Sequence, residues 1–443
     1  MSAPPVLPPL KDTTQSIYRL EFAEDGFPGQ READGELVIN PIFGKYAVQD
    51  FLLQAEQSDD ERFIEAAAVV GRAAIRRMEE FKGGLVFWYG HETKPVRNPE
   101  MHYSGLTQSH YLIMFQRLAG LTGEQAFADA AELVLASLKV PVEKGGVLYL
   151  RDFGSIIAET PLEPNDVILN GWLTAMLNVW DYAELSVSPA ARKLFDENLA
   201  ALRSVIHLFD VPELSNSRYG SAGFAYFKLL FPPKPAGATP YEVSDLTLVV
   251  PDERPHPVTR TDGSRWQLYA FPQDLDRHED GVFGLSGRAL RLNLVLNYLA
   301  APRTNELRLT VEAPTAGTAT LQIRAAGYSP KSAAPSADPE WVVVSTVDVQ
   351  PGVNEVCWSI GWDVAGLLAY PTSFLKKVGE SFYNVYHFLH IDQLRRLHQL
   401  AGEDFLLEYA ERWTRYVDED WPSMDIYADV ETGPSPHRGH PYR

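Results

Sequence analysis

The stretch FYNVYHFLHIDQLRRLHQL, residues 382–400, predicts the helix around which the rest of the chain is organised. Its side chains at steps of four, three, four and three residues share one helical face. These are Tyr386, His390, Gln393, Leu397 and Leu400. The face is polar at its N-terminal end and apolar at its C-terminal end. This change predicts a helix packed in a core, with first turns that open into a cavity.

The start of this predicted helix carries one phenol and two imidazoles, from Tyr386, His387 and His390. Spacing alone favours ordinary amphipathic side chains, because a Tyr or His in an apolar setting is usually a satisfied core residue. The two histidines could also bind a metal, but no matching carboxylate pattern accompanies them. Support of Tyr386 by His387 and His390 is therefore the favoured functional interpretation, with no metal and no cofactor.

Composition excludes several classes of partner. The chain has 443 residues and a formal net charge of −20, from 39 basic and 59 acidic residues. This balance argues against nucleic acid and against an anionic membrane surface. Cys357 is the one cysteine, which excludes a disulfide framework. The proline-rich start predicts no signal peptide, and no apolar stretch is long enough to span a membrane, so we expect a cytoplasmic protein.

Apolar residues at helical spacing recur through most of the chain. They predict a helix from Asp60, a pair over 107–118 and 123–140, another starting at Pro164, and one capped by Ser188. A last pair is predicted over 386–400 and 403–418. Helix hairpins that recur in this way predict an α/α toroid, whose inner helices line a central groove.

Between these helices the period changes from helical to alternating. Leu292, Leu294 and Leu296 alternate with polar residues, and turn signals separate several such runs. We therefore predict a mixed fold, an α/α toroid of helix hairpins with an inserted antiparallel β-sandwich. The predicted parts are an N-terminal arm (1–45), a discontinuous toroid (46–231 and 373–421), the β insertion (232–372) and a tail (422–443).

Several segments together resemble the D-glucuronyl C5-epimerases. They are Tyr386-His387 with His390-Ile391 and Gln393-Leu394, Asn170-Gly171, Arg218-Tyr219, and the hairpin beginning at residues 104–108. The resemblance implies an α/α toroid that inverts uronic acids within heparosan-type chains. It also implies a homodimer. The inserted β region has no counterpart in the animal members, which carry β-structure before the helical domain.

The resemblance also implies site residues. The family uses three tyrosines and an adjacent glutamate, and Tyr386, Tyr219 and Glu159 match three of these positions as catalytic residues. The third tyrosine position is Thr160 here, and threonine has no usable acid–base pKa. Glu159, His387, His390, Tyr103 or His110 could substitute for it. Arg218 and Arg151 are candidate partners for the substrate carboxylate, and Asn170 and Gln108 are candidate substrate contacts.

The chemistry explains why these residue types matter. Removal of the C5 proton of a uronic acid places charge on the adjacent carboxylate, which cations or strong donors must neutralise. Epimerisation needs a base on one face of the ring and an acid on the other. With a leaving group at C4 and no opposite acid, the same carbanion eliminates, and the enzyme is a lyase.

Three functions stay open at this point. We predict a uronate C5-epimerase that acts on a glucuronate-containing glycan. A polysaccharide lyase on the same scaffold is favoured by Thr160. A non-catalytic glycan-binding protein is favoured by the acidic charge and the added β region. In the alternative without a catalytic role for these residues, Tyr219 packs on the toroid rim and Glu159 is a solvated carboxylate. The polymer, its linkage and its sulfation do not follow from the sequence.

Overall fold

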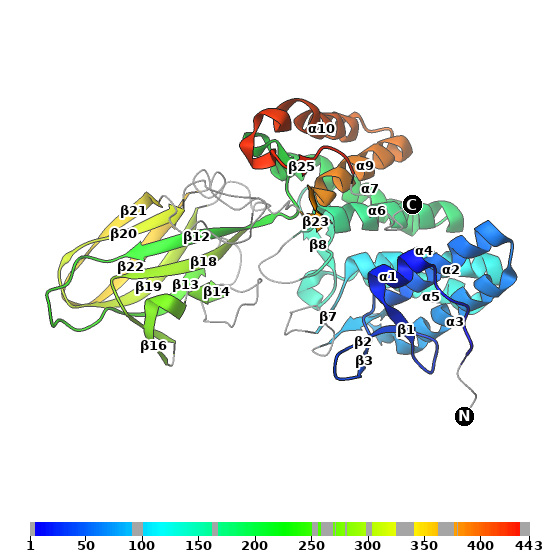
Figure 1. Ribbon diagram of the computed structural model, residues 1–443, viewed down its shortest axis with the longest axis horizontal. Helices are drawn as coiled ribbons and strands as arrows, with labels where there is room; N and C mark the ends of the chain where they lie inside the picture. Colours follow the sequence, from blue (N-terminus) through cyan, green and yellow to red (C-terminus); the bar gives the residue numbers. More distant parts are fainter. Residues whose placement is uncertain are drawn as a thin grey trace. The chain divides into compact units, whose positions relative to one another are not determined.

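The computed structural model describes residues 5–90, 101–161, 167–249, 256–257, 269–270, 272–279, 281–297, 304–324, 341–361, 376–378 and 380–434. The chain divides into two compact units (Figure 1). A helical unit comprises Met1–Tyr219 and Leu375–Arg443, and a β unit comprises Gly220–Phe374. The helix start predicted at Pro164 and the last residues of the predicted tail lie outside the described residues.

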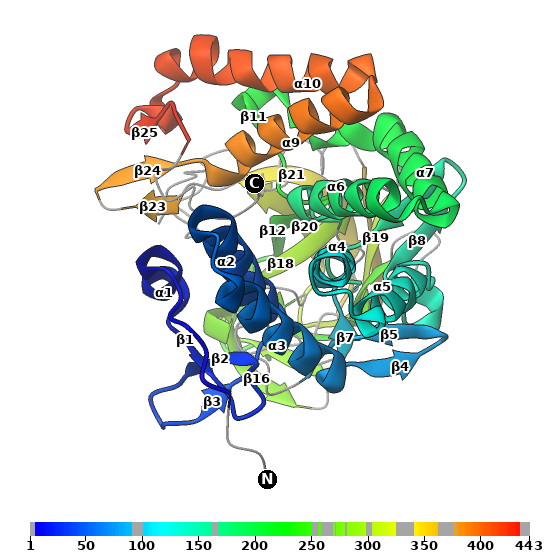
Figure 2. The ribbon, with the colours of Figure 1, turned by 90° about the vertical axis from the view of Figure 1, so that its right-hand side faces the viewer.

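The helical unit consists of helices paired in hairpins. The described residues contain α2 (Phe43–Ser58) with α3 (Glu61–Arg77), α4 (Gly105–Thr122) with α5 (Gln125–Leu138), α6 (Leu169–Ser186) with α7 (Pro189–Val205), and α9 (Val385–Ala401) with α10 (Asp404–Arg415). Helix α4 contacts α2 and α6, and α6 contacts α9 (Figure 2). The helices predicted from Asp60, after Ser188 and over residues 386–400 are confirmed. The described helices form no closed barrel.

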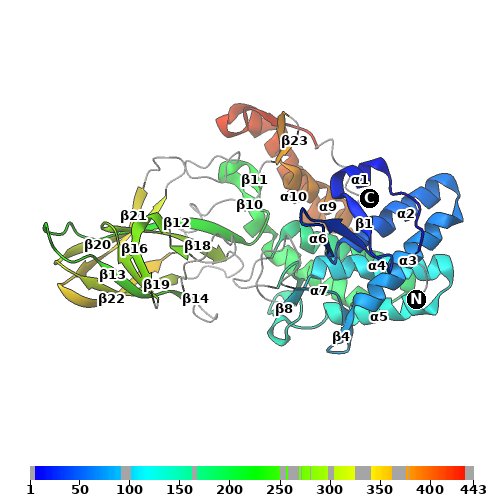
Figure 3. The same ribbon diagram turned by 60° about the horizontal axis from the view of Figure 1, so that its bottom comes forward.

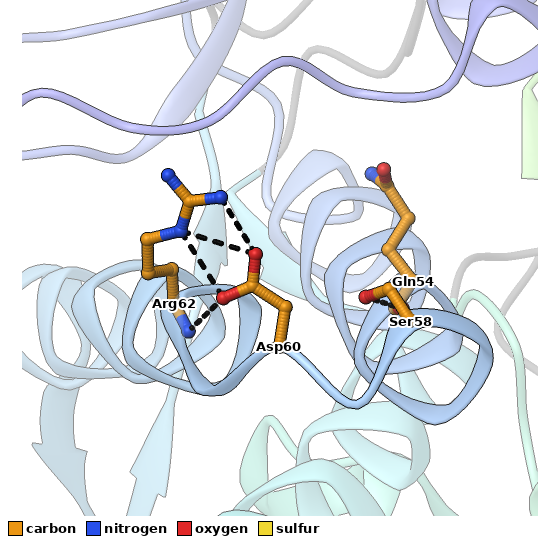
Figure 4. A network of polar contacts seen from close by, with 4 residues as sticks. All are labelled: Gln54, Ser58, Asp60 and Arg62. Carbon is orange, nitrogen blue, oxygen red and sulfur yellow. Dashed lines mark hydrogen bonds and ion pairs between the residues drawn. The ribbon is translucent and has the colours of Figure 1, made fainter.

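The turn between α2 and α3 shows how local chemistry sets the helix ends (Figure 4). The Ser58 hydroxyl donates to the Gln54 carbonyl at 2.7 Å. The Asp60 carboxylate accepts the Arg62 backbone N–H at 3.0 Å, which caps α3. The Arg62 guanidinium returns to the same carboxylate at 2.7 Å. Because the cap satisfies an N–H that the helix leaves unpaired, α3 starts at a defined residue.

Short sheets connect the hairpins of the helical unit. They are β1 (Leu20–Phe22), β2 (Pro28–Arg31) and β3 (Leu37–Val38); β4 (Glu79–Phe81) and β5 (Gly84–Val86); β6 (Trp88–Tyr89) and β7 (His102–Tyr103); β8 (Leu148–Arg151) and β9 (Gly154–Ile157); β10 (Asp210–Val211) and β11 (Asn216–Ser217); and β23 (Lys376–Val378), β24 (Ser381–Tyr383) and β25 (Val430–Glu431). All pair antiparallel except β24 with β25.

The structure corrects the predicted ends of the chain. Residues 1–45 are not a loose arm, because they contain α1 (Asp12–Tyr18) and the first sheet, and Phe27 is fully buried. The predicted tail is folded as far as β25, and Tyr427 and Val430 in it are buried in a small hydrophobic cluster with Val417 and Trp421. Weak periodicity concealed these buried side chains in the sequence.

Two predicted helix positions also change. The helix predicted over residues 107–118 runs through Gly120 and ends at Gly123, which has φ of 72° and caps it in the left-handed region. Helix α6 begins at Leu169, so Asn170 and Gly171 lie in its first turn rather than in its middle.

The β unit contains two antiparallel sheets (Figure 3). One has the order β15 (Tyr269–Ala270), β18 (Ala289–Asn297), β12 (Ala222–Leu230), β20 (Gly317–Arg324), β21 (Trp341–Val349). The other has the order β16 (Leu275–Glu279), β17 (Val282–Leu285), β13 (Glu242–Val249), β19 (Asn305–Ala313), β22 (Gly352–Ile360), with β14 (His256–Pro257) on β13. Side chains of both sheets share one hydrophobic core. Because β12 starts at Ala222, the alternating structure begins before the predicted boundary at residue 232. The interpretation as an inserted β-sandwich stays a prediction.

Within the described residues, every helix is too short or too polar to cross a membrane.

Candidate functional site

Polar contacts tie helices α4, α6 and α9 to one another and to the segment just before α2. The Gln393 side chain of α9 donates to the Asn170 carbonyl at the start of α6, at 3.0 Å. The Tyr111 hydroxyl of α4 donates to the carbonyl of Pro41, just before α2, at 2.6 Å. Asn178 of α6 lies 3.2 Å from the imidazole of His110 on α4. Segments far apart in the sequence are therefore joined within the helical unit.

Two predicted catalytic residues, Tyr219 and Tyr386, lie against each other. Their ring centroids are 4.5 Å apart and the rings meet edge to face at 64°. The Tyr219 carbonyl accepts the Leu169 N–H at 2.8 Å, which fixes Tyr219 beside the start of α6. Both tyrosines are partly exposed. Two phenols are thus accessible at one place on the helical unit.

Glu159 follows β9 and lies over the first turn of α6. The preceding carbonyl, of Ala158, accepts the Gly105 N–H at the start of α4 at 3.1 Å. A Cβ atom added at Gly171 would collide with the Glu159 carboxylate. The glycine in the Asn170-Gly171 pair therefore leaves the space that the Glu159 side chain occupies. Glu159 and Thr160 are both partly exposed.

The first turn of α2 contributes Lys45 and Tyr46. Lys45 is only 2% exposed, and burial lowers its pKa to about 7. Its ammonium nitrogen lies 4.8 Å from the centroid of the Tyr46 ring. Burial raises the pKa of Tyr46 to about 12, and electrostatic interactions with Glu159 and Tyr386 act in the same direction. Tyr46 therefore lies within electrostatic reach of both predicted catalytic residues.

His387 and His390 form a buried neutral pair bridged by Ser217. The Ser217 hydroxyl lies 2.9 Å from Nδ1 of each ring, and the Ser217 N–H donates to His387 Nδ1 at 3.1 Å. His387 Nε2 lies 3.0 Å from the Trp413 carbonyl, which can only accept, so Nε2 carries the proton. Burial lowers the pKa of His387 to about 4 and that of His390 well below its usual range. The pair thus fixes the first turns of α9, which carry Tyr386.

Asn170 combines a hydrogen-bonded backbone carbonyl with a buried side-chain oxygen that is not satisfied by the described residues. Its carbonyl accepts Gln393 Nε2 at 3.0 Å and the Thr174 hydroxyl at 2.7 Å. The side chain is buried, and Oδ1 has no hydrogen-bond partner among the described residues. An acceptor in this state can take a donor from a bound ligand or water.

Other predicted substrate contacts have structural roles. The Tyr103 hydroxyl donates to the Ser137 carbonyl at 2.8 Å. Gln108 donates to the Leu85 carbonyl at 2.7 Å and to the Ser137 hydroxyl at 2.9 Å, and it accepts the Phe87 N–H. Both residues are fully buried, so neither is available to a substrate.

Arg151 and Arg218 differ from the prediction in distinct ways. Arg151 pairs with Gly154 at the turn of the β8–β9 hairpin, whereas Glu159 follows the opposite end of β9. At about 3.3 Å per residue, five residues separate the two positions by about 16 Å along the strand, so Arg151 is not part of this cluster.

Arg218 adjoins Tyr219 but is 6% exposed. His110 is also buried, and desolvation together with the nearby Lys45 charge lowers its pKa.

Sequence reasoning missed Lys45, Tyr46 and Ser217. The first two lay in or beside the predicted arm, although Ala47, Val48, Phe51 and Leu52 repeat at helical spacing and could have revealed α2. Ser217 carries no signal of its own, because only the fold brings it to the two histidines. Among the described residues, no three His, Cys, Asp or Glu side chains come together as a potential metal site.

The candidate site thus lies in a unit built of helix hairpins. It contains clustered phenols, a carboxylate and buried imidazoles. The model of the family described as D-glucuronyl C5-epimerase C-terminus matches residues 80–226. This match includes Glu159, Asn170, Gly171, Arg218 and Tyr219. It confirms the predicted relationship to that family.

Other comparisons give more distant likenesses. An uncharacterised protein of Methanocaldococcus jannaschii is 30% identical over 98 residues, which are 21% of this chain and 32% of that protein. The chain thus spans about a third of the length of this curated relative. An α-1,6-mannanase of Salegentibacter sp. aligns with a TM-score of 0.33 and 15% identity, over 47% of this chain and 52% of that chain. An unsaturated glucuronyl hydrolase of Bacillus sp. GL1 aligns with a TM-score of 0.31 and 10% identity, over 45% and 55% of the two chains.

Proposed function

We propose that this protein is a uronic-acid C5-epimerase acting on a glucuronate-containing polysaccharide or oligosaccharide. The observation that carries the proposal is the contact of Tyr219 with Tyr386, in a chain that matches the C5-epimerase family model. Glu159 is held beside the start of the same α6 helix. Accessible phenols and a carboxylate are the acid–base groups that proton transfer at C5 requires.

The proposed reaction moves one proton and breaks no carbon–oxygen bond. A base takes the C5 proton, and the electron pair passes into the adjacent carboxylate as an enolate. An acid then delivers a proton to the opposite face, and the pair returns to C5. We assign Tyr386 to proton transfer, with Tyr219 and Glu159 as its partners. Asn170 keeps an acceptor available for a substrate hydroxyl.

The negative charge that develops on the substrate carboxylate during proton removal must be stabilised by a cation. Arg218 was the expected partner, and the buried Lys45 is a second candidate, because it adjoins the accessible Tyr46. His387 and His390 act indirectly in this proposal: their bonds to Ser217 hold the first turns of α9, and thereby Tyr386, in position.

The finer features of the fold belong to the same proposal. We propose that the hairpins form an arc of an α/α toroid and that the β unit is an inserted β-sandwich. The shared core of the two sheets supports the second assignment. A homodimer and a cytoplasmic location remain predictions, as does the absence of nucleic-acid and membrane partners.

A lyase is the second candidate function. Thr160 stands where the family has a tyrosine, and it cannot return a proton to the opposite face. If no other group does so, the carbanion eliminates at C4. The same active-site base would then yield an unsaturated sugar.

One experiment separates these functions. The purified full chain is incubated with glucuronate polymers, including heparosan, in deuterated water, and the products are followed by proton NMR and ultraviolet absorbance. We expect deuterium at C5 and the appearance of the inverted uronate. An unsaturated, ultraviolet-absorbing product would instead identify a lyase. Binding without either change would leave the glycan-binding interpretation and contradict both enzymatic ones.

A further inference from the structure

We infer that Tyr46 is a catalytic acid of this site, the phenol that replaces the one lost at Thr160 and acts on the face of the uronate opposite Tyr386. This inference rests on the proposed function. It concerns a residue outside the matched family segment, on a different secondary-structure element from the position it replaces. The chain would then have kept two-sided proton transfer while moving one phenol from the segment after β9 to helix α2.

The first support is the division between accessible and buried groups. The substitutes expected from the sequence included Tyr103, His110, His387 and His390, and all four are buried. Lys45 is buried as well. Tyr46 is partly exposed, like Tyr219, Tyr386 and Glu159. A group that transfers a proton to a sugar ring must be reachable, so Tyr46 and Glu159 remain.

The second support is the origin of each phenol. Tyr219 and Tyr386 are in ring contact, so these two phenols lie together. Tyr46 comes from α2, which reaches the site through α4: Tyr111 donates to Pro41 just before α2, and its hydroxyl contacts Gly44. Tyr386 and Glu159 both interact electrostatically with the Tyr46 phenol. Tyr46 is therefore close to the other acid–base groups but is presented by a separate element.

The third support is how Tyr46 is held and protonated. Its ring stacks on Tyr18 with centroids 3.9 Å apart and planes 13° apart, which restricts its rotation. Gly44 packs against Tyr111 and Phe27, leaving no room for a Cβ, so the start of α2 is fixed. Burial raises the pKa of Tyr46 to about 12, which keeps the phenol protonated near neutral pH. A neutral, positioned phenol suits the acid half of the reaction.

The proton balance is explicit. Tyr386, as the phenolate, takes the C5 proton from one face, and the electron pair enters the carboxylate. The Tyr46 O–H bond then breaks as a new C5–H bond forms on the other face. Tyr386 releases its proton to solvent, and the Tyr46 phenolate recovers a proton from solvent, so both groups return to their starting states. In the reverse direction the two tyrosines exchange roles.

The test is Tyr46→Phe in the full chain, on a polymer into which the wild type incorporates deuterium. Inversion should fall by about 10²–10⁴-fold, the usual loss for a positioned acid–base group. Exchange at C5 should persist in the one epimer whose hydrogen faces Tyr386. This split between exchange and inversion would not arise from a merely structural tyrosine.

Tyr111→Phe is the matched control, because it also removes a phenolic oxygen at the start of α2. It should lower the melting temperature while leaving the ratio of inversion to exchange unchanged. Wild-type inversion by Tyr46→Phe, or an equal loss of exchange in both epimers, would overturn the inference. Absence of deuterium incorporation by the wild type would refute the proposed function itself.

Discussion

The helical unit and the β unit differ in what they bury. In the β unit, side chains from both sheets form a core that is almost wholly apolar, with Trp358 and Leu292 fully buried. The described part of the helical unit buries many polar and ionisable side chains, among them Lys45, His387 and His390. Burying such groups costs free energy unless they form hydrogen bonds. Buried polar side chains are therefore candidates for a structural or functional role.

We infer from this difference that the helical unit carries the proposed function. Ser217 bridges two imidazoles, and Gln393 bonds the first turn of α6. These contacts restrict the partly exposed Tyr219 and Tyr386 beside them. The β unit is held together mainly by apolar packing between its two sheets. Substitutions in the two units should therefore separate into effects on rate and effects on stability.

The largest expected effect is on rate in the helical unit. Tyr386→Phe keeps the ring volume and removes only the phenolic oxygen. We expect C5 exchange to fall about 10²–10⁴-fold with an unchanged melting temperature. Deuterium incorporation by purified protein measures the first and thermal unfolding the second. Wild-type incorporation by a normally folded variant would remove Tyr386 from the mechanism and leave Tyr219 as the candidate base.

The corresponding substitution in the β unit should act on stability alone. Leu292→Ala truncates a fully buried side chain in the shared core. It should lower the free energy of unfolding of the β unit by about 2–5 kcal/mol, through lost apolar contact and the cavity that remains. Denaturant unfolding gives this value, and exchange per folded molecule should stay at the wild-type level. A large loss of exchange without a loss of stability would break the proposed division between the units.

Acid should destabilise the helical unit through His387. Its pKa is about 4 in the folded protein and 6.5 in the unfolded chain. Between these values the unfolded state binds more protons, so stability falls as the pH falls from 6.5 towards 4. The full effect of this difference is about 3 kcal/mol.

Denaturant unfolding of the wild type and of His387→Gln across this pH range measures that effect. The glutamine variant should be less stable near neutral pH and should show a shallower loss on acidification. Parallel curves for the two proteins would show that His387 does not carry the pH dependence.

The smallest expected effect on the exchange rate comes from the contact between Glu159 and Gly171. Gly171→Ala places a methyl group where the Glu159 carboxylate lies, so the carboxylate must move. We expect an exchange rate at least about tenfold lower, since displacing a catalytic group by about 1 Å is costly. Gly120→Ala in α4 is the matched control, because a Cβ there meets open space.

The control should stabilise the protein by about 0.4–1 kcal/mol, as alanine restricts the unfolded chain, and should leave exchange unaltered. Equal exchange rates in the two glycine variants would show that the position of Glu159 is unimportant.

Much of the helical unit could be predicted from local pattern. The spacing of Phe63, Ala67 and Val70 predicted α3, and Ser188 predicted the start of α7. Predictions failed where aromatic residues fold without a clear period, as in residues 1–45 and around Trp421 and Tyr427. Tyr386 and Tyr219 were identified by resemblance, and only the structure put their rings in contact.

Local sequence pattern was enough to predict most of the helices and the alternating strands, because the period of apolar residues and the capping side chains act within a few neighbouring residues. The match to the C5-epimerase family model over residues 80–226 is likewise a property of the sequence. Which polar residues are reachable and which are structural became clear from the folded chain alone. Tyr103 and Tyr46 are the same residue type, yet one is fully buried with its hydroxyl on Ser137 and the other is partly exposed beside Lys45. Accessibility depends on how distant segments pack, and no local pattern contains that information.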